Sequence, residues 1–166
     1  MGVFAALAAW RSAKAAEAAN GHLIKQQILA ARSTVAQLVA TATYEYKRNE
    51  TLAKRMRSQI AQEAQFNGGL GGTSQIKLDK EVTAQMERSM AAFGYAQRLD
   101  GDVSLISKLA SSDVEIAQCE LPMSISKLRA IGDELQRDSE LSAARILQHH
   151  ERAINRPLEP VASTAA

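Results

Sequence analysis

Between residues 24 and 60, apolar residues recur mostly at alternating steps of three and four, which is the spacing of one face of an α-helix. No proline occurs between Val3 and Phe66, and Gly21 is the only glycine in that stretch. A periodic run of this length is typical of a coiled coil or of an arm of a helical bundle. We therefore predict a long helix that ends near Phe66 and carries an oligomer seam along its apolar face: Ile24, Ile28, Val35, Leu38, Leu52, Met56 and Ile60.

Apolar positions at helical spacing also follow the glycine-rich residues 67–74. Gly101 predicts an interruption, because glycine costs about 1 kcal/mol in a helix interior. Pro122 predicts a firmer boundary near 121–122, since proline disfavours a helical conformation in the residue before it, and Ser124 can cap the next helix. No alternation typical of a β-strand is present, so the sequence predicts an all-α fold, a long helical hairpin or bundle with coiled-coil character.

We divide the chain into three parts. Residues 1–21 form an Ala-rich amphipathic N-terminal segment, and Asn20-Gly21 is a candidate break or kink at its end. Residues 22–155 form the long-helix bundle, with its turn at 67–74 and its break near 121–122. Residues 156–166 are small, polar and interrupted by proline, so we expect a flexible or extended C-terminal tail.

Four of the nine glycines stand close together in the stretch NGGLGGTS: Gly68, Gly69, Gly71 and Gly72. A phosphate-binding loop of the Walker type needs a preceding strand and a lysine directly before the Ser/Thr. Here a helix precedes the glycines, and no lysine stands before Thr73 or Ser74. We therefore interpret the four glycines as a hinge turn, in which a left-handed backbone ends one helix and reverses the chain.

The composition favours a thin bundle. Hydrophobic residues reach 46% but include many alanines, and aromatic residues are only 4%, so few large side chains are present to fill a core. The net charge is +2 and is distributed unevenly. Residues 1–66 hold nine Lys/Arg and four Glu, whereas residues 67–166 hold eleven Lys/Arg and fourteen Asp/Glu. Opposite charge favours packing of the two halves on each other or on other copies.

No group of residues suggests catalysis, metal binding or cofactor binding. His149 and His150 are adjacent, so on a helix they point about 100° apart and do not form the i, i+4 pair that a metal site uses. His22 is the remaining histidine, and Cys119 is the only cysteine. We expect no cofactor and no enzymatic activity.

A basic run in the first half is a candidate contact for DNA or another phosphate-bearing partner. Lys47 and Lys54 are seven residues apart, as are Arg48 and Arg55, so the four charges form a stripe along one helix. The alternatives are a solvated helix face or a stripe that pairs with the acidic second half.

The N-terminus is a candidate for contact with a membrane or another subunit. Val3, Leu7 and Trp10 recur at i, i+4 and i+7, Phe4 is adjacent, and Arg11 follows. An apolar face with basic neighbours is typical of a helix that lies in a membrane interface. Burial against another subunit is the alternative, because Ala-rich helices can approach each other closely.

Residues 55–99 carry a resemblance to a known family. They read RMRSQIAQEAQFNGGLGGTSQIKLDKEVTAQMERSMAAFGYAQRL. The features are Arg57 and Gln59 before the turn, Gly71, Thr73 and Ser74 at the turn, and Phe93-Gly94-Tyr95 after it. In this order, the chain resembles the small internal virion proteins of short-tailed phages, also called core or ejection proteins, over residues 25–105. The turn has more glycine than is usual in that family.

The resemblance implies a non-enzymatic virion protein that assembles as a homo-oligomeric ring inside the capsid at the portal vertex. Its expected partners are the portal and other core or tail proteins, together with genomic DNA. On infection it would be ejected and help to form a conduit for DNA across the host outer membrane and periplasm. The alternatives are a self-assembling membrane-interacting protein unrelated to phages and a helical nucleic-acid-binding module with a basic stripe.

Overall fold

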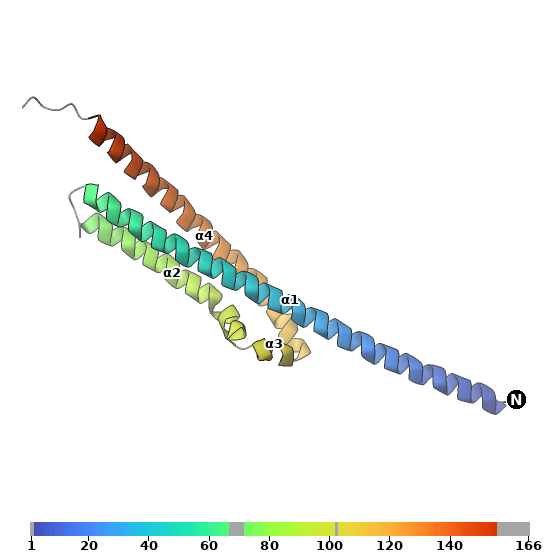
Figure 1. Ribbon diagram of the computed structural model, residues 1–166. Coiled ribbons are helices and arrows are strands. Elements are labelled where there is room, and N and C mark those ends of the chain that lie inside the picture. The colour runs from blue at the N-terminus through green and yellow to red at the C-terminus, as the bar shows by residue number, and fades with distance from the viewer. Residues whose placement is uncertain (1, 67–71, 102, 156–166) are drawn as a thin grey trace, which may run out of the picture. The chain divides into compact units, whose positions relative to one another are not determined.

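The computed structural model describes residues 2–66, 72–101 and 103–155, and their side chains from Trp10 onward apart from Val103 and Ala153. Its helices are α1 (Gly2–Phe66), α2 (Thr73–Asp100), α3 (Val103–Lys108) and α4 (Ser111–Ile154). These described ranges contain four helices and no strand. The predicted all-α bundle is therefore confirmed (Figure 1).

The helices form two compact units. The arm unit comprises Met1–Tyr44 and Phe93–Ser126, and the core unit comprises Glu45–Ala92 and Lys127–Ala166. Helices α1, α2 and α4 each contribute one part to each unit, whereas α3 belongs to the arm unit.

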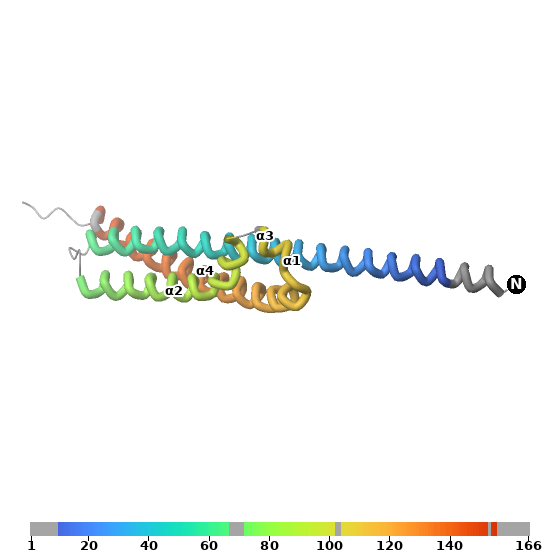
Figure 2. Tube along the Cα trace, turned by 90° about the horizontal axis from the view of Figure 1, so that it is seen from below, coloured from blue at the N-terminus to red at the C-terminus, as the bar shows by residue number. Residues whose placement is uncertain are grey.

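In the core unit, α1 and α4 run parallel, and α2 runs antiparallel to both (Figure 1, Figure 2). Residues that come later in α1 contact residues that come later in α4 but earlier in α2. The contacts that establish these directions are Arg48–Asp133, Glu63–Arg145, Asn49–Ser89 and Arg57–Asp79.

The apolar centre of the core unit is small. Leu135 has no exposed surface and packs in a cluster with Ala53, Met56, Ile60, Val82 and Ile131. Leu52, Leu78 and Met86 pack against this cluster from its edge. Few large side chains are buried here, as the composition predicted, so each of them accounts for a large share of the apolar area that stabilises the unit.

The predicted oligomer seam is covered over most of its length by the chain's own helices. Ile24 is exposed, Ile28, Leu38 and Leu52 are half-buried, and Val35, Met56 and Ile60 are buried. Coiled-coil spacing identifies an apolar face but does not identify the chain that covers it. Of these seven residues, only Ile24 is exposed for contact with another copy.

Two predicted helix breaks are wrong. Helix α1 continues through Gly21, because the flanking alanines have high helix propensity and the cost of one glycine is only about 1 kcal/mol. Helix α4 continues through Pro122, so the break near 121–122 is absent and Ser124 lies buried inside the helix instead of capping one. Pro122 is on the exposed side of α4, where water can satisfy the carbonyl that loses its N–H partner.

The interruption predicted around Gly101 is confirmed, since α2 ends at Asp100 and α3 begins at Val103. A further interruption lies between α3 and α4, which the apolar spacing did not reveal. There the Arg32 guanidinium donates a hydrogen bond of 2.6 Å to the Leu109 carbonyl, a group that no longer belongs to a helix. The predicted C-terminal tail, residues 156–166, lies outside the described residues.

Ion pairs connect the two halves of the sequence. Of the six ion pairs among described residues, four join α1 to a later helix. Arg48–Asp133 and Arg57–Asp79 place the basic partner on α1, as the charge distribution predicted, whereas Glu45–Arg129 and Glu63–Arg145 have the opposite sense. Pairs of this kind with exposed partners contribute about 0–1 kcal/mol each, so they mainly specify how the helices align.

A buried amide lies at the contact of α1 with α2 and α4 in the core unit. Asn49 has no exposed surface. Its Nδ2 donates hydrogen bonds to the Ser89 hydroxyl at 3.1 Å and to the Leu128 carbonyl at 2.9 Å. Its Oδ1 points at Gly132, where an added Cβ would lie 2.5 Å away. A single buried polar residue at such a position favours one register of the helices.

Candidate assembly surfaces

The first part of α1 is exposed, and only near its end do Ile24 and Gln27 line a groove with the first turns of α4. Every side chain from Trp10 to Gln27 is exposed, and we call this segment the arm. Trp10 is 61% exposed, Leu23 54% and Ile24 56%. Figure 1 shows the blue part of α1 continuing past α3.

Alanine makes the arm helical, but alanine does not stabilise an isolated helix in water for long. Short helices without tertiary contacts are marginal, even when their sequences are rich in alanine. The arm therefore combines a strong helical tendency with exposed apolar groups, and contact with another surface would stabilise both.

The arm has an apolar side and a basic side. At about 100° per residue, Trp10, Ala13 and Ile24 continue the face that α1 buries further along. Arg11, Lys14 and Lys25 lie on the adjacent side, and the Lys14 Nζ is 5.0 Å from the centre of the Trp10 ring.

The N-terminal contact set predicted from sequence is placed only in part. Val3, Phe4 and Leu7 belong to the helical backbone of α1, but their side chains lie outside the described ones. Trp10 is therefore the one member of that set whose side chain can be located, and it is exposed.

The first turns of α4 carry a second exposed apolar surface, which we call the outer stripe. Ile116, Cys119 and Met123 recur at i, i+3 and i+7, and all three are exposed. They lie on the side of α4 opposite to Val114 and Leu121, which are buried. Helical spacing alone did not predict this stripe, because apolar residues lie on two opposite sides of this part of α4.

The outer stripe is bordered by acidic residues. Asp113, Glu115 and Glu120 are all exposed, and residues 111–123 contain no basic residue. This part of α4 is therefore the acidic counterpart of the basic arm.

Tyr95, on the α2 segment of the arm unit, lies near enough to two of these acidic residues to be affected by their charge. Burial raises the pKa of its phenol above 10.0, Arg98 opposes the shift, and Glu120 and Asp113 add to it.

The raised pKa of Tyr95 makes the stability of the protein depend on pH. Because the folded pKa exceeds the unfolded one, the stabilisation from the neutral phenol is complete below pH 10 and is lost as pH rises through the folded value. We expect urea denaturation midpoints to fall more between about pH 8 and about pH 11 for the native chain than for Tyr95→Phe. Equal losses in both chains would contradict the shift.

The predicted hinge turn is only partly within the structure. Gly68, Gly69 and Gly71 lie outside the described residues. Gly72 directly precedes α2, and its carbonyl accepts a hydrogen bond of 3.1 Å from the Ile76 N–H. Gly72 therefore occupies the N-terminal capping position of α2.

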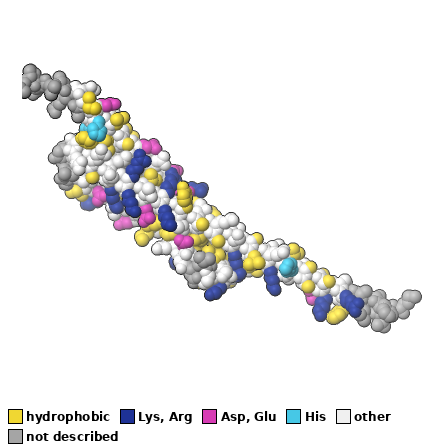
Figure 3. Space-filling view, viewed as in Figure 1, with side chains coloured by type: hydrophobic (Ala, Val, Ile, Leu, Met, Phe, Trp, Pro, Cys, Tyr) yellow, Lys and Arg dark blue, Asp and Glu magenta, His cyan; other side chains and the backbone are white. Residues whose placement is uncertain are grey.

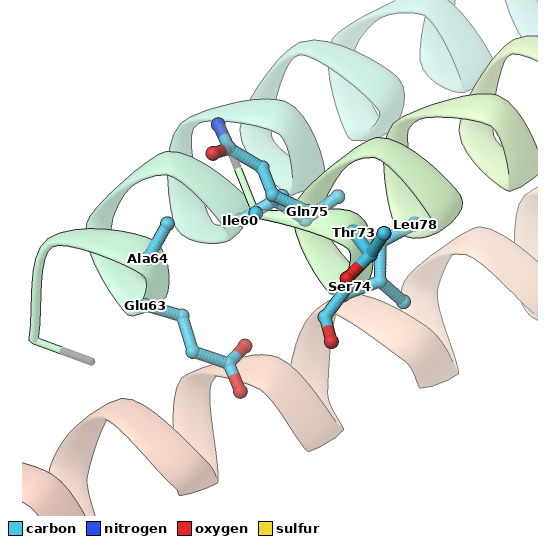
Figure 4. Close-up of a pocket in the computed structure, with 8 residues that line it drawn as sticks. Ile60, Glu63, Ala64, Thr73, Ser74, Gln75 and Leu78 are labelled. Atoms are coloured by element: carbon cyan, nitrogen blue, oxygen red, sulfur yellow. The ribbon is translucent and has the colours of Figure 1, made fainter. Parts of the chain in front are cut away.

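A hollow of about 220 Å³ lies beside Gly72 in the core unit (Figure 4). Its lining includes Glu63 and the first residues of α2, and no basic residue is among the lining residues. The Glu63 carboxylate accepts a hydrogen bond from the Ser142 hydroxyl at 3.2 Å and pairs with Arg145 at 3.6 Å. A carboxylate without a basic neighbour in the lining disfavours an anion, so the hollow does not suit a phosphate.

The predicted basic stripe is not a set of four free charges. Lys47, Lys54 and Arg55 are exposed, but Arg48 is half-buried and bonded within the core unit. Its guanidinium contacts the carboxylates of Glu45 and Asp133 and donates to the Gln136 side chain at 3.0 Å. On the face in Figure 3, basic and acidic side chains are interspersed over the core unit.

The adjacent histidines pack on an aromatic ring. His149 stacks on Phe66 with ring centres 6.3 Å apart, and His150 meets the same ring edge-on at 4.5 Å. Across residues 2–66, 72–101 and 103–155, no group of three or more His, Cys, Asp or Glu could hold a metal ion. Within the same ranges, no helix is both long and apolar enough to span a bilayer.

Comparison with known proteins gives no relative for this chain: no family model, curated protein or solved structure matches it.

Proposed function

We propose that the chain is a non-enzymatic structural subunit that assembles with copies of itself through the arm. The observation that carries this proposal is the exposure of every side chain from Trp10 to Gln27 along one unbroken helix. Assembly explains why an Ala-rich helix carries an exposed tryptophan together with exposed Leu23 and Ile24.

The energetics favour assembly over a solvated arm. Burying one large apolar side chain contributes about 1.5–3 kcal/mol, and the arm offers Trp10, Leu23 and Ile24. Association also costs translational freedom and side-chain freedom, so a single arm contact would be weak. A closed ring, in which every copy both gives and receives an arm, makes two such contacts per copy.

We propose further that the assembly belongs to the setting that the family resemblance implies. In this proposal, the chain is an internal core or ejection protein of a short-tailed phage, packaged at the portal vertex beside DNA and other core proteins. The similarity of residues 25–105 to that family supports it, as does the exposed arm. Mass spectrometry of purified particles of a phage that encodes this chain should detect it at several copies per particle. Its absence from such particles would overturn the virion proposal and leave self-assembly to be judged separately.

Replacing Trp10 with alanine should weaken self-association roughly tenfold or more, because buried tryptophans often dominate the energy of an interface. Sedimentation equilibrium and native mass spectrometry measure this directly. The matched control is Tyr44→Ala, which removes another exposed aromatic side chain from α1 at a position outside the arm.

A native chain that remains monomeric up to millimolar concentration would contradict the proposed function. Flotation of the native chain with anionic lipid vesicles, lost in Trp10→Ala while the chain stays monomeric without lipid, would instead support the membrane alternative.

A further inference from the structure

We infer that the arm of one copy docks on the outer stripe of a second copy, with Trp10 packed against Ile116 and Met123. This inference rests on the proposed self-assembly and specifies the two surfaces that meet. Both surfaces belong to the arm unit, and their side chains are described individually.

The apolar parts of the two surfaces are similar in form. Ile116 and Met123 are 53% and 54% exposed, and they are seven residues apart on one side of α4. The arm presents Trp10 with Ala13 next to it on the same side of its helix. Small residues beside one large residue let two helices approach closely while the tryptophan fills the space between exposed side chains.

The charges of the two surfaces are complementary. The arm holds Arg11, Lys14 and Lys25 against the single acidic Glu17, a net charge of +2. The outer stripe is bordered by Asp113, Glu115 and Glu120 without a basic residue from 111 to 123, a net charge of −3. Complementary fields of this kind favour the correct pairing and disfavour contact of two arms or of two stripes.

The contact must join different copies. The outer stripe lies on the side of α4 opposite to Val114 and Leu121, which are buried within the unit. The arm continues α1 as one unbroken helix, so it does not turn back onto that outward side. An arm that binds a different surface on its neighbour makes a heterologous contact, and such contacts generate a closed ring or an open filament.

Cys119 lies within the outer stripe, is exposed and is the only cysteine of the chain, so it serves as a native cross-linking probe. The donor chain carries Ala13→Cys together with Cys119→Ser, and the acceptor is the native chain. The matched donor carries Ala15→Cys with Cys119→Ser. Ala13 lies about 60° from Trp10 around the helix axis and Ala15 about 140°, and both are exposed alanines.

Mild oxidation of mixed donor and acceptor should link residue 13 to Cys119 at least about tenfold faster than residue 15, because only residue 13 shares the side of Trp10. A single chain that carries both Ala13→Cys and native Cys119 should form a ladder of linked dimers, trimers and higher species. An isologous contact between two arms would instead stop at dimers.

Charge reversal gives a second measure that does not depend on disulfide chemistry. Arg11→Glu with Lys14→Glu should weaken self-association on the order of tenfold, and mixing these chains with Glu115→Lys, Glu120→Lys copies should restore association. Equal linking rates at residues 13 and 15, or charge variants that assemble normally, would overturn the inference while self-assembly stands. A native chain that does not assemble at all overturns the proposed function as well.

Discussion

Replacing Leu135 with alanine is expected to lower the free energy of unfolding of the core unit by about 2–5 kcal/mol. Leu135 has no exposed surface and belongs to a cluster with side chains from α1, α2 and α4, among them Ile60 and Val82. Truncation removes buried methyl groups and leaves a cavity that surrounding helices can fill only in part. Urea denaturation, followed by circular dichroism at one low protein concentration, measures the change.

Leu147→Ala is the matched control, since it makes the same substitution in the same helix at a side chain that is 60% exposed. Its effect should stay within about 0.5 kcal/mol. Similar losses for Leu135→Ala and Leu147→Ala would show that the two positions are equally buried, and this would contradict the packing of α4 described above.

Replacing Gly132 with alanine is expected to destabilise the core unit by about 1–3 kcal/mol, although alanine is the better helix former. The new Cβ would lie 2.5 Å from Asn49 Oδ1 and 3.5 Å from a terminal nitrogen of Arg48. The Asn49 amide cannot move aside freely, because its Nδ2 is bonded to Ser89 and to the Leu128 carbonyl. Relief of the clash therefore requires either broken buried hydrogen bonds or a separation of α1 from α4.

Two further variants isolate this effect. Gly94→Ala places the same methyl group in a helix interior where nothing lies within 4 Å, so it should stabilise the protein by about 0.5–1 kcal/mol. In a chain that already carries Asn49→Ala, the cost of Gly132→Ala should largely disappear, because the atom that clashes is gone. Additive effects of Gly132→Ala and Asn49→Ala would mean that the close approach of the two helices is not the cause.

Much of the fold was accessible from local rules. The end of α1 at Phe66 and the interruption around Gly101 were predicted. Both predictions rest on a local property of glycine, which adopts backbone conformations that end a helix. Pro122 shows where these rules stop. A proline breaks a helix only when tertiary packing does not hold both sides, and the buried residues Leu121 and Ser124 hold them here.

The surfaces were less predictable than the helices. Heptad spacing correctly identified Val35, Met56 and Ile60 as packed positions, but it could not show that the same chain covers them. The pairing of Arg48 with Asp133, residues 85 positions apart, depends on tertiary structure, so a local stripe of four basic residues gave no sign of it. Among the surfaces, the arm was the one for which the sequence suggested a contact with a membrane or another subunit, since its alanines and its tryptophan stand together in the sequence.

The parallel arrangement of α1 and α4 has a consequence for synthesis of the protein. Hydrogen bonds between these helices join residues 79 to 88 positions apart, from Glu63–Ser142 to Arg48–Gln136. Such contacts form late. The long chain segment between the two helices loses conformational entropy before the contacts between them can compensate for that loss. On the ribosome, α1 and α2 emerge before α4, so Met56 and Ile60 lack the cover that Ile131 and Leu135 give until α4 has emerged. Neighbouring nascent chains could therefore exchange α4 segments, and slow translation of the region before α4 would lengthen the period in which this exchange competes with correct folding.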